Sequence, residues 1–320
     1  MKNIQNIVIG IDIGGTNTKF GLVSREGKIL AKSTVSTKGY ENINKFIDTL
    51  HNEINKLIKN LPEKTAIKGI GIGAPNGNIF RGTIEYAANL DWKGFIPIGS
   101  LMQEKFNVRV KVTNDANAAA LGEKLFGKGK NISNFMTITL GTGLGSGIIA
   151  GDNLLYGHSG FAGEAGHVIV KENGRLCGCG RKGCLETYVS ANGLLKTVKE
   201  LLSATDEESM IRNIQFNTLT SKNIYDYAKN GDFIALKAFN FTAEILGKAL
   251  ANFTALLSPE KIFLFGGLAE AGDLLIKPTE KYMNDNLLSI CKNTVSIEKS
   301  GLKSGDVAIL GASALIWQLY

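Results

Sequence analysis

A plan of strand, Gly-Thr turn and strand occurs twice in the chain and constrains its fold more than any other feature. The first copy reads IVIGIDIGGTNTKFGLV over residues 7–23, and the second reads FMTITLGTGLGSGII over residues 135–149. Each copy joins two runs rich in β-branched residues through glycine and threonine, a composition typical of strands that meet at a tight turn. Two such units in one chain predict a duplicated α/β domain.

Apolar periodicity predicts helices that alternate with further strands. Helices are expected at 43–58, 116–126, 186–202, 235–257, near Ala269 and at 307–319, and strands at 67–74, 108–113 and 261–265. The last helix is expected to pack back on the first domain. We therefore expect a layered α/β fold with two domains. The predicted N-terminal domain has residues 1–117 plus the C-terminal helix 306–320, and the larger C-terminal domain has residues 118–305.

Composition narrows the class of protein. The 320 residues are 44% hydrophobic, enough for sizeable cores, and 38 are glycine, well above the usual ~7%. The early apolar run, residues 7–13, is short and contains Asp12, so neither a signal peptide nor a membrane span is expected, and a cytoplasmic protein is predicted. The net charge of +7 is spread among acidic residues without a basic stripe, so nucleic acid is not an expected partner.

Residues 163–186 hold a metal-ligand pattern. Cys177, Cys179 and Cys184 are three of the four cysteines, and His167, one of three histidines, lies upstream. A His/Cys3 set is typical of tetrahedral structural zinc, which leaves no open position for water. Free thiols, or a disulfide of Cys177 or Cys179 with Cys184 or with Cys291, are the alternatives, although no secretory context favours a disulfide.

Glycine-rich turns provide candidate phosphate contacts. In the first turn, Gly14 and Gly15 allow a phosphate close to backbone N–H groups, and Thr16, Asn17 and Thr18 add side-chain donors. Asp12 is a candidate to hold, through a bound water, a magnesium ion that bridges phosphates. By itself the turn is also compatible with a plain hairpin. The second turn, with Gly141, Thr142 and Gly143, and the pair Gly266 and Gly267 favour a nucleotide site.

The segment Asn114-Asp115 follows a predicted strand and opens a helix. One interpretation makes Asp115 the helix N-cap. The other makes it the carboxylate that accepts a substrate hydroxyl proton during attack on a γ-phosphate, and the helix N-terminus would favour its ionised form. Asn89, Glu164 and Glu186 are each compatible with a turn or a surface charge, but the two glutamates beside a zinc loop suit vicinal hydroxyls.

Taken in order, these motifs resemble the ROK family of repressors, open reading frames and kinases. The segments that carry the resemblance are DIGGT from Asp12, NDANAA from Asn114, Gly141–Gly143, GEAGH from Gly163, the cysteine segment ending at Glu186, and Gly266–Gly267. The resemblance spans nearly the whole chain. It implies an actin-like, ribonuclease H-like fold with two duplicated domains and a cleft between them.

The family resemblance also implies an activity, phosphorylation of a hexose by ATP with Mg²⁺. It implies that Asp115 takes the proton of the sugar 6-hydroxyl, that the two Gly-Thr turns and Gly266–Gly267 bind the nucleotide, and that structural Zn²⁺ is bound. It further implies that domain closure on the sugar excludes water, and that the protein is a homodimer. The implied sugar contacts are Asn89, Asn114, Asp115, Glu164, His167 and Glu186; the implied zinc ligands are His167, Cys177, Cys179 and Cys184.

The segment Ala74-Pro75-Asn76-Gly77 departs from the family pattern of Pro-Gly. Asn76 is therefore either a sugar contact or a turn residue. Glucose is the expected substrate, with N-acetylmannosamine and then fructose as alternatives. Repressors of the family carry a helix-turn-helix module ahead of the first turn, and the stretch before Gly14 is too short for it. A non-catalytic sugar sensor is disfavoured because Asp115 is present.

Overall fold

The computed structural model describes residues 5–62, 65–303 and 305–320. The chain forms two compact units. The first comprises the residues up to Ser133 together with Gly147–Gly163 and Gly301–Tyr320. The second comprises Asn134–Ser146 and Glu164–Ser300. The C-terminal segment therefore returns to the first unit.

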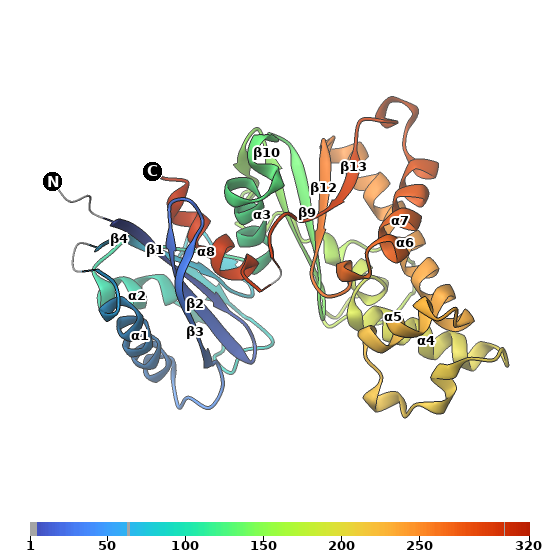
Figure 1. Ribbon diagram of the computed structural model, residues 1–320, viewed down its shortest axis with the longest axis horizontal. Helices are drawn as coiled ribbons and strands as arrows, with labels where there is room; N and C mark the ends of the chain where they lie inside the picture. Colours follow the sequence, from blue (N-terminus) through green and yellow to red (C-terminus); the bar gives the residue numbers. More distant parts are fainter. Residues whose placement is uncertain (1–4, 63–64, 304) are drawn as a thin grey trace. The chain divides into compact units, whose positions relative to one another are not determined.

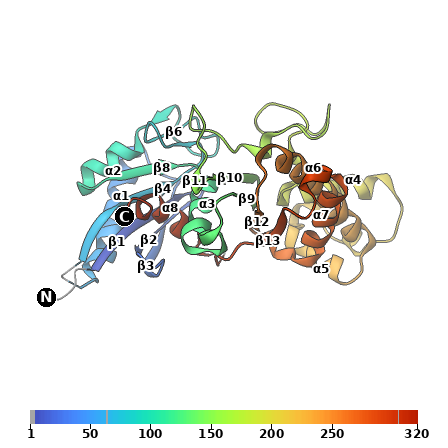
Figure 2. The ribbon, with the colours of Figure 1, turned by 90° about the horizontal axis from the view of Figure 1, so that it is seen from above.

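The first unit is built on a five-stranded sheet with the order β3-β2-β1-β4-β8. β1 pairs antiparallel with β2 and parallel with β4, and β4 pairs parallel with β8. Helices α1 and α2 cover one face of the sheet, and α8 covers the other, beside α3 (Figures 1 and 2). The elements are β1 (Gln5–Ile13), β2 (Asn17–Ser24), β3 (Ile29–Ser36), α1 (Ile43–Lys59), β4 (Thr65–Gly73), α2 (Ile98–Phe106), β8 (Val110–Thr113), α3 (Asp115–Phe126) and α8 (Val307–Trp317).

Strand β1 shows why both faces of this sheet are covered. Alternate side chains of a strand point to opposite faces. Ile7 and Ile9 join the core under α1, whereas Val8 packs with Ile316 of α8. On the α8 face, glycines bring the backbones close: a Cβ on Gly71 would lie 1.8 Å from the Ala312 carbonyl oxygen. Helix α8 therefore rests directly on the sheet.

A small three-stranded sheet, β5-β6-β7, follows β4 in the first unit. It lies in the connection from β4 to α2, and both of its strand pairs are antiparallel. Its strands are β5 (Gly77–Asn78), β6 (Thr83–Glu85) and β7 (Phe95–Ile96). The sequence pattern did not predict this sheet, because strands of two or three residues are too short to show periodicity.

The second five-stranded sheet has the order β11-β10-β9-β12-β13. β12 pairs parallel with both β9 and β13. Helix α6 packs against α7 and α4, which forms the helical part of the second unit (Figure 1). The strands of this sheet are β9 (Phe135–Leu140), β10 (Leu144–Ala150), β11 (Asn153–Leu154), β12 (Lys261–Phe265) and β13 (Ser296–Lys299). The helices of the second unit are α4 (Ala191–Ala204), α5 (Ser221–Lys229), α6 (Phe233–Leu257) and α7 (Asp273–Asn286).

The two large sheets share one topology. Each begins with a strand, β1 or β9, that leads through a Gly-Thr turn into the neighbouring strand, β2 or β10. In each sheet the third strand follows on the outer side, and two parallel strands follow on the other side. The duplication predicted from the repeated motif is confirmed, and the fold is the actin-like, ribonuclease H-like α/β fold.

One helix boundary differs from its prediction. The expected helix at 186–202 begins at Ala191, because the Ser190 hydroxyl caps it by accepting a hydrogen bond from the Gly193 N–H group. Glu186 instead lies in a short 3-10 helix, Leu185–Thr187. Near Ala269 the chain forms the 3-10 helix Ala269–Ala271, and the longer α7 follows it.

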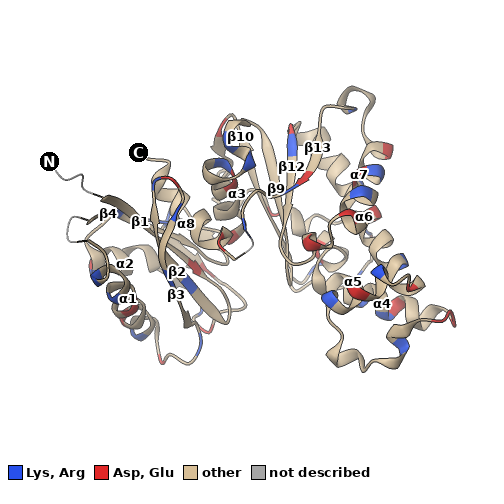
Figure 3. Ribbon diagram, viewed as in Figure 1, with Lys and Arg blue, Asp and Glu red and all other residues tan. Residues whose placement is uncertain are grey.

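Charged residues of both signs are interspersed on the surface helices, as on α1 and α7 (Figure 3). On α7, Lys277 pairs with Asp273 and Lys281 pairs with Asp285. Among the described residues, no helix combines the length and the apolar character needed to span a membrane.

Candidate functional site

The turn between β1 and β2 presents part of the predicted phosphate contact. The Gly14 N–H group donates to the Asn17 carbonyl across the turn, at 3.0 Å, and the Thr16 and Asn17 side chains are exposed. Thr18 is fully buried, and its hydroxyl lies 2.8 Å from that of Thr37. The hydroxyl of Thr18 therefore supports the turn from inside, and the side-chain donors that remain open are those of Thr16 and Asn17.

The structure separates the two interpretations of Asn114-Asp115. Asn114 is the N-cap of α3, and its Oδ1 accepts from the N–H groups of Ala116 and Asn117 at 2.7 and 3.2 Å. Asp115 is the first helical residue, with an exposed side chain whose Oδ1 accepts from Ala116 at 2.8 Å. Because Asn114 provides the cap, the interpretation of Asp115 as the N-cap is wrong. Its other carboxylate oxygen remains available for chemistry.

Asp12, at the end of β1, lies beside Asp115. Gly73 of β4 lies next to both, because its Cβ would be 3.6 Å from the Asp115 Cα and 4.0 Å from the Asp12 Oδ1. Burial, and then repulsion from Asp115, raise the pKa of Asp12 to about 6, whereas Lys19 acts to lower it. Desolvation by the surrounding protein also raises the pKa of Asp115, although its side chain is exposed at one side. The hydrogen bond from the Ala116 N–H group acts in the opposite direction and lowers this pKa. The two carboxylates therefore compete for ionisation.

Two predicted asparagine contacts lie near the small sheet of the first unit. Asn76 has a left-handed backbone with φ of 52°, and its amide donates to the carbonyl of Glu85 at 2.9 Å. This geometry is typical of a turn residue. Asn89 is exposed beside the β1–β2 turn, since a Cβ on Gly15 would lie 3.3 Å from its Nδ2.

In the second unit, the turn Gly141–Gly143 lies against Gly266–Gly267. The Leu140 carbonyl accepts from the Leu268 N–H group at 3.1 Å. A Cβ on Gly266, whose φ is +100°, would lie 2.5 Å from the Leu140 carbonyl oxygen. Glycine is required there for both conformation and space. The predicted nucleotide contacts of the second unit thus form one surface.

A cavity of about 370 Å³ opens beside Gly267. It lies between α5, α6 and the start of the segment that leads into α7. Its lining includes apolar and aromatic groups together with a few polar ones. The lining residues are Ser221, Lys222, Tyr225, Phe239, Gly267, Leu268, Glu270 and Ala271. Tyr225 and Phe239 were not predicted from the sequence, because only the tertiary packing of α5 and α6 brings them to Gly267.

The segments around Glu164 and Glu186 meet at the start of β10. The Ala165 N–H group donates to the Ser146 hydroxyl at 3.3 Å, which places the exposed Glu164 at this edge. Glu186 lies over the Gly141–Gly143 turn: its Oε2 accepts from the Leu144 N–H group at 2.9 Å. Both predicted sugar-binding carboxylates therefore lie in the second unit, near the second Gly-Thr turn.

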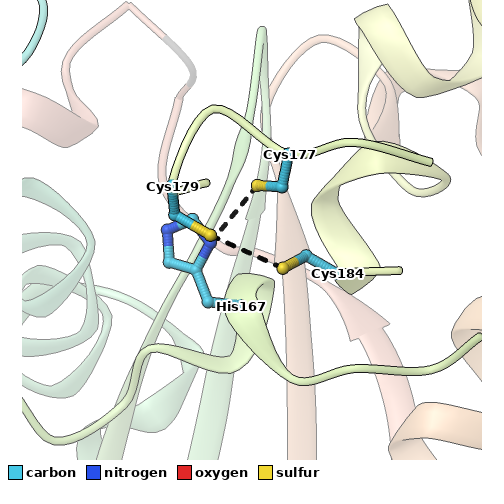
Figure 4. Close-up of side chains that lie close together, drawn as sticks. All are labelled: His167, Cys177, Cys179 and Cys184. Carbon is cyan, nitrogen blue, oxygen red and sulfur yellow. Dashed lines mark hydrogen bonds between the residues drawn. The ribbon is translucent and has the colours of Figure 1, made fainter. Parts of the chain in front are cut away.

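The predicted metal ligands form a cluster (Figure 4). The donor atoms of His167, Cys177, Cys179 and Cys184 all lie within 4.8 Å of one another. The Cys177 Sγ is 3.7 Å from the His167 Nδ1, and the Cys179 and Cys184 Sγ atoms are also 3.7 Å apart. A tetrahedron with Zn–S bonds of ~2.3 Å has edges of about 3.8 Å. The spacing therefore fits a tetrahedral zinc site.

The chemistry of the donors agrees with this fit. All four cysteines are free, so no disulfide forms in the described structure. Hydrogen bonding from the Arg181 backbone N–H, and then the neighbouring thiols, lower the pKa of Cys179 to about 6. Burial raises the pKa of Cys177 to about 11, and burial raises that of Cys184 too. A bound cation would stabilise the thiolate forms of these buried sulfurs.

The fold and these groups define a class of protein: an actin-like α/β protein with two Gly-Thr turns and a His/Cys3 cluster whose spacing is compatible with zinc. Comparison with known proteins agrees. The model of the ROK family matches residues 8–318. A glucokinase of Halalkalibacterium halodurans is 34% identical over 314 residues, covering 97% of this chain and 94% of that protein.

Two further relatives show the range of this group. A xylose repressor of Caldicellulosiruptor bescii is 33% identical over 312 residues, covering 97% of this chain and 77% of the repressor. A ROK family glucokinase of Streptomyces griseus, solved in complex with glucose and AMPPNP, superposes with a TM-score of 0.79. It is 32% identical, and the match covers 98% of this chain and 99% of that one. The chain belongs to the ROK family, and its resemblance to the sugar kinases of that family is confirmed.

Proposed function

We propose that this protein is an ATP-dependent hexose kinase that transfers the γ-phosphoryl group of ATP to the 6-hydroxyl of glucose. The observation that carries the proposal is the placement of Asp115. The carboxylate is exposed at the N-terminus of α3, and Asn114 relieves it of the capping role. The relatives named glucokinase, one of them solved with glucose and AMPPNP, support this choice of substrate and nucleotide.

In the proposed mechanism Asp115 is the general base. Its free carboxylate oxygen accepts the proton of the 6-hydroxyl as that oxygen attacks the γ-phosphorus and ADP leaves. The products are glucose 6-phosphate and ADP, with the proton left on Asp115. The Ala116 N–H group holds the other carboxylate oxygen at 2.8 Å and so orients the base.

The two Gly-Thr turns are proposed to hold the phosphates of ATP. The first turn offers Thr16 and Asn17. In the second unit, the turn Gly141–Gly143 and the cavity beside Gly267 lie on one surface, which supports phosphate binding at the turn and adenine binding in the cavity. The aromatic side chains of Tyr225 and Phe239 suit a flat base.

Asp12 is proposed to help hold Mg²⁺, through its carboxylate or through a bound water. The electrostatics of the site suit a bound cation. Asp115 repels the Asp12 carboxylate, and Lys19 is the group that attracts it. A divalent cation nearby would stabilise both ionised carboxylates. When bound with ATP, Mg²⁺ neutralises charge on the phosphates.

The sugar hydroxyls are proposed to be bound by Asn89, Asn114, Glu164, His167 and Glu186, and Asn76 is proposed to serve the turn. Carboxylates accept hydrogen bonds from vicinal hydroxyls. Zn²⁺ held by His167 and the three cysteines would fix the loop that carries Glu186 and take no part in phosphoryl transfer. The protein is further proposed to act as a cytoplasmic homodimer.

The substrate is tested by ADP release from the purified protein with Mg-ATP and each of five sugars. The panel is glucose, mannose, fructose, N-acetylglucosamine and N-acetylmannosamine. Glucose is expected to give the highest kcat/KM. A clear preference for N-acetylmannosamine or fructose would replace glucose but keep the kinase assignment, and no ADP release with any sugar would overturn it.

The base is tested with Asp115→Asn. This change keeps the shape of the side chain but removes the proton acceptor, so kcat is expected to fall ~10²–10⁴-fold while glucose still binds. Glucose binding by calorimetry controls for folding. Turnover close to that of the unchanged protein would contradict the assignment of Asp115.

A second candidate function is a sugar-sensing regulator without catalysis, which the similarity to a xylose repressor favours. Such a protein would bind a sugar without releasing ADP. The same calorimetry, carried out with glucose and xylose, separates the two candidates when it is combined with the ADP assay.

A further inference from the structure

Glu186 connects three parts of the second unit that differ in their proposed roles. It follows Cys184 of the metal cluster closely in the chain, and it is one of the proposed sugar contacts. Its Oε2 accepts from the Leu144 N–H group at 2.9 Å, immediately after the Gly141–Gly143 turn. Its Oε1 lies 3.9 Å from the Sγ of Cys177.

The contact between Glu186 and the turn is close enough to restrict the sequence of the turn. A Cβ on Gly143 would lie 2.2 Å from the Glu186 Oε2 and 3.1 Å from its Cδ. By contrast, a Cβ on Gly141 would meet no atom within 4 Å. The φ of Gly143 is not in the left-handed region that favours glycine, so a side chain at this position would act by displacing the Glu186 carboxylate from the turn.

The other side of the same turn is also fixed. The Gly141 carbonyl accepts from the N–H group of Ala191, the first residue of α4, at 2.9 Å. The Ser190 hydroxyl donates to the Glu186 carbonyl at 2.8 Å. The segment from Glu186 to Ala191 thus holds both ends of the turn, with the carboxylate at one end and the helix start at the other.

We propose that Glu186 is a positioning residue for the nucleotide: its carboxylate sets the conformation of the Gly141–Gly143 turn through the Leu144 N–H group. A hydrogen bond to a charged acceptor is stronger than a neutral one, so its loss would loosen the turn. The inference rests on the proposed function, since it assumes that this turn binds phosphates. It makes one side chain serve both the sugar and the nucleotide.

The test compares Glu186→Ala with Glu186→Gln. Both remove the charge, but glutamine keeps an oxygen that can accept from the Leu144 N–H group. AMPPNP binding is measured by calorimetry without sugar, and zinc content is measured on the same samples. Glu186→Ala is expected to weaken AMPPNP binding about tenfold, whereas Glu186→Gln is expected to keep most of the original affinity.

Glu172→Ala is the matched control, because Glu172 is an exposed carboxylate of the same loop. It is expected to bind AMPPNP like the unchanged protein. In steady-state kinetics, Glu186→Gln is expected to raise the KM for glucose while the KM for ATP stays near its original value. A role for Glu186 in general stability alone would change neither constant selectively.

A double-mutant cycle with Gly143→Ala tests the contact itself. Gly143→Ala alone is expected to weaken AMPPNP binding, because the new methyl group collides with the Glu186 carboxylate. With Glu186→Ala present the collision is gone, so the double variant is expected to bind no worse than Glu186→Ala. Additive losses would overturn the proposal.

The remaining outcomes are also decisive. AMPPNP affinity of Glu186→Ala within twofold of the original would overturn the positioning role, as would equal losses in both Glu186 variants. Loss of zinc together with AMPPNP binding in Glu186→Ala would overturn it too, since Glu186 would then act on the whole loop. If the unchanged protein does not bind AMPPNP, the proposed function fails instead, which separates the two failures.

Discussion

At the scale of single residues, the coupling of Asp12 and Asp115 has a consequence for the dependence of the rate on pH. Burial and mutual repulsion raise the pKa of Asp12 to about 6, and the pKa of Asp115 is also raised. The ionised forms are the proposed working forms, of the base at Asp115 and of the magnesium partner at Asp12. An apparent pKa read from a rate profile would therefore belong to the pair rather than to either residue.

We therefore expect kcat/KM for glucose to fall as the pH decreases through about 6, and to approach a tenfold loss for each further pH unit. The measurement is a profile of kcat/KM from about pH 5 to 9. Because kcat/KM reports the ionisation of the free enzyme, bound sugar does not alter the pKa values that this profile measures. A rate that stays constant down to pH 5 would contradict the raised pKa values.

The same coupling predicts that Asp12→Asn stabilises the protein. The pKa of Asp12 is higher in the folded state than its ordinary 3.8, so the folded state holds the proton more tightly. The resulting destabilisation is present above about pH 6 and is relieved as the pH falls toward 3.8. The full difference in pKa between the folded and unfolded states corresponds to roughly 3 kcal/mol. Because Asp12 is partly solvated, the expected gain in the free energy of unfolding for Asp12→Asn is about 1–2 kcal/mol at pH 7.5.

The measurement is the free energy of unfolding by urea at pH 7.5 and at pH 4. Asp91→Asn, a change at an exposed aspartate of the same unit, is the control. The gain is expected for Asp12→Asn at pH 7.5 and is expected to be much smaller at pH 4. Equal stability of Asp12→Asn and the original at both pH values would argue against a buried, repelled carboxylate.

At the scale of elements, the joint between α8 and the first sheet depends on glycine. Gly10 and Gly71 lie on adjacent strands, and a Cβ on either would lie within 2.2 Å of a carbonyl oxygen of α8. The neighbouring atoms belong to backbone, which cannot rotate away as a flexible side chain can. The C-terminal helix can therefore complete the first unit only where these strands lack side chains.

Gly71→Ala is expected to destabilise the first unit by about 3 kcal/mol, at the upper end for overpacking, because helix and sheet must separate. The matched control is Gly305→Ala, an exposed glycine before α8 whose added Cβ would meet no atom within 4 Å. Thermal unfolding followed by circular dichroism measures both. A Tm for Gly71→Ala equal to that of Gly305→Ala would show that α8 does not rest on the sheet in this way.

At the scale of the whole molecule, the His/Cys3 cluster belongs to one of two compact units. His167 and the three cysteines all lie in the second unit. A structural metal stabilises the unit that binds it and leaves the other unit largely unaffected. The chain is therefore expected to unfold in more than one step once the metal is removed.

Cys184→Ser tests this expectation, with Cys291→Ser as control, since Cys291 lies outside the cluster. Cys184→Ser is expected to reduce the bound zinc from about one per chain. It is also expected to lower the midpoint temperature of one calorimetric transition by ~5 °C or more. Cys291→Ser is expected to change neither. Full zinc content and unchanged unfolding in Cys184→Ser would refute the site.

The sequence predicted the elements whose signals are local. Helix α1 was expected at 43–58 and runs over Ile43–Lys59, and β12 occupies the predicted residues. The four residues of the His/Cys3 cluster were also picked out, because three of them crowd into one short loop. In these cases the signal, apolar periodicity or the spacing of the cysteines, is a local property of the sequence.

Side-chain roles were less predictable where two polar residues compete for one function. Asn114 and Asp115 are both good N-caps, and only the path of the backbone from β8 into α3 selects Asn114. Thr18 was grouped with the open donors of the first turn, but strand pairing between β2 and β3 directs its hydroxyl to Thr37. Neighbouring residues of a strand face opposite ways, so a shift of one position decides exposure.

The duplicated strand and turn plan, the main helices and the residues of the His/Cys3 cluster could be predicted from the sequence, because each depends on residues close together in the chain. Three arrangements follow from the tertiary structure alone: Asp12 lies beside Asp115, Tyr225 and Phe239 line the cavity at Gly267, and the Glu186 carboxylate accepts a hydrogen bond from the Leu144 N–H group. These contacts join distant segments. Their geometry depends on the pairing of strands and the packing of helices, which no local pattern contains.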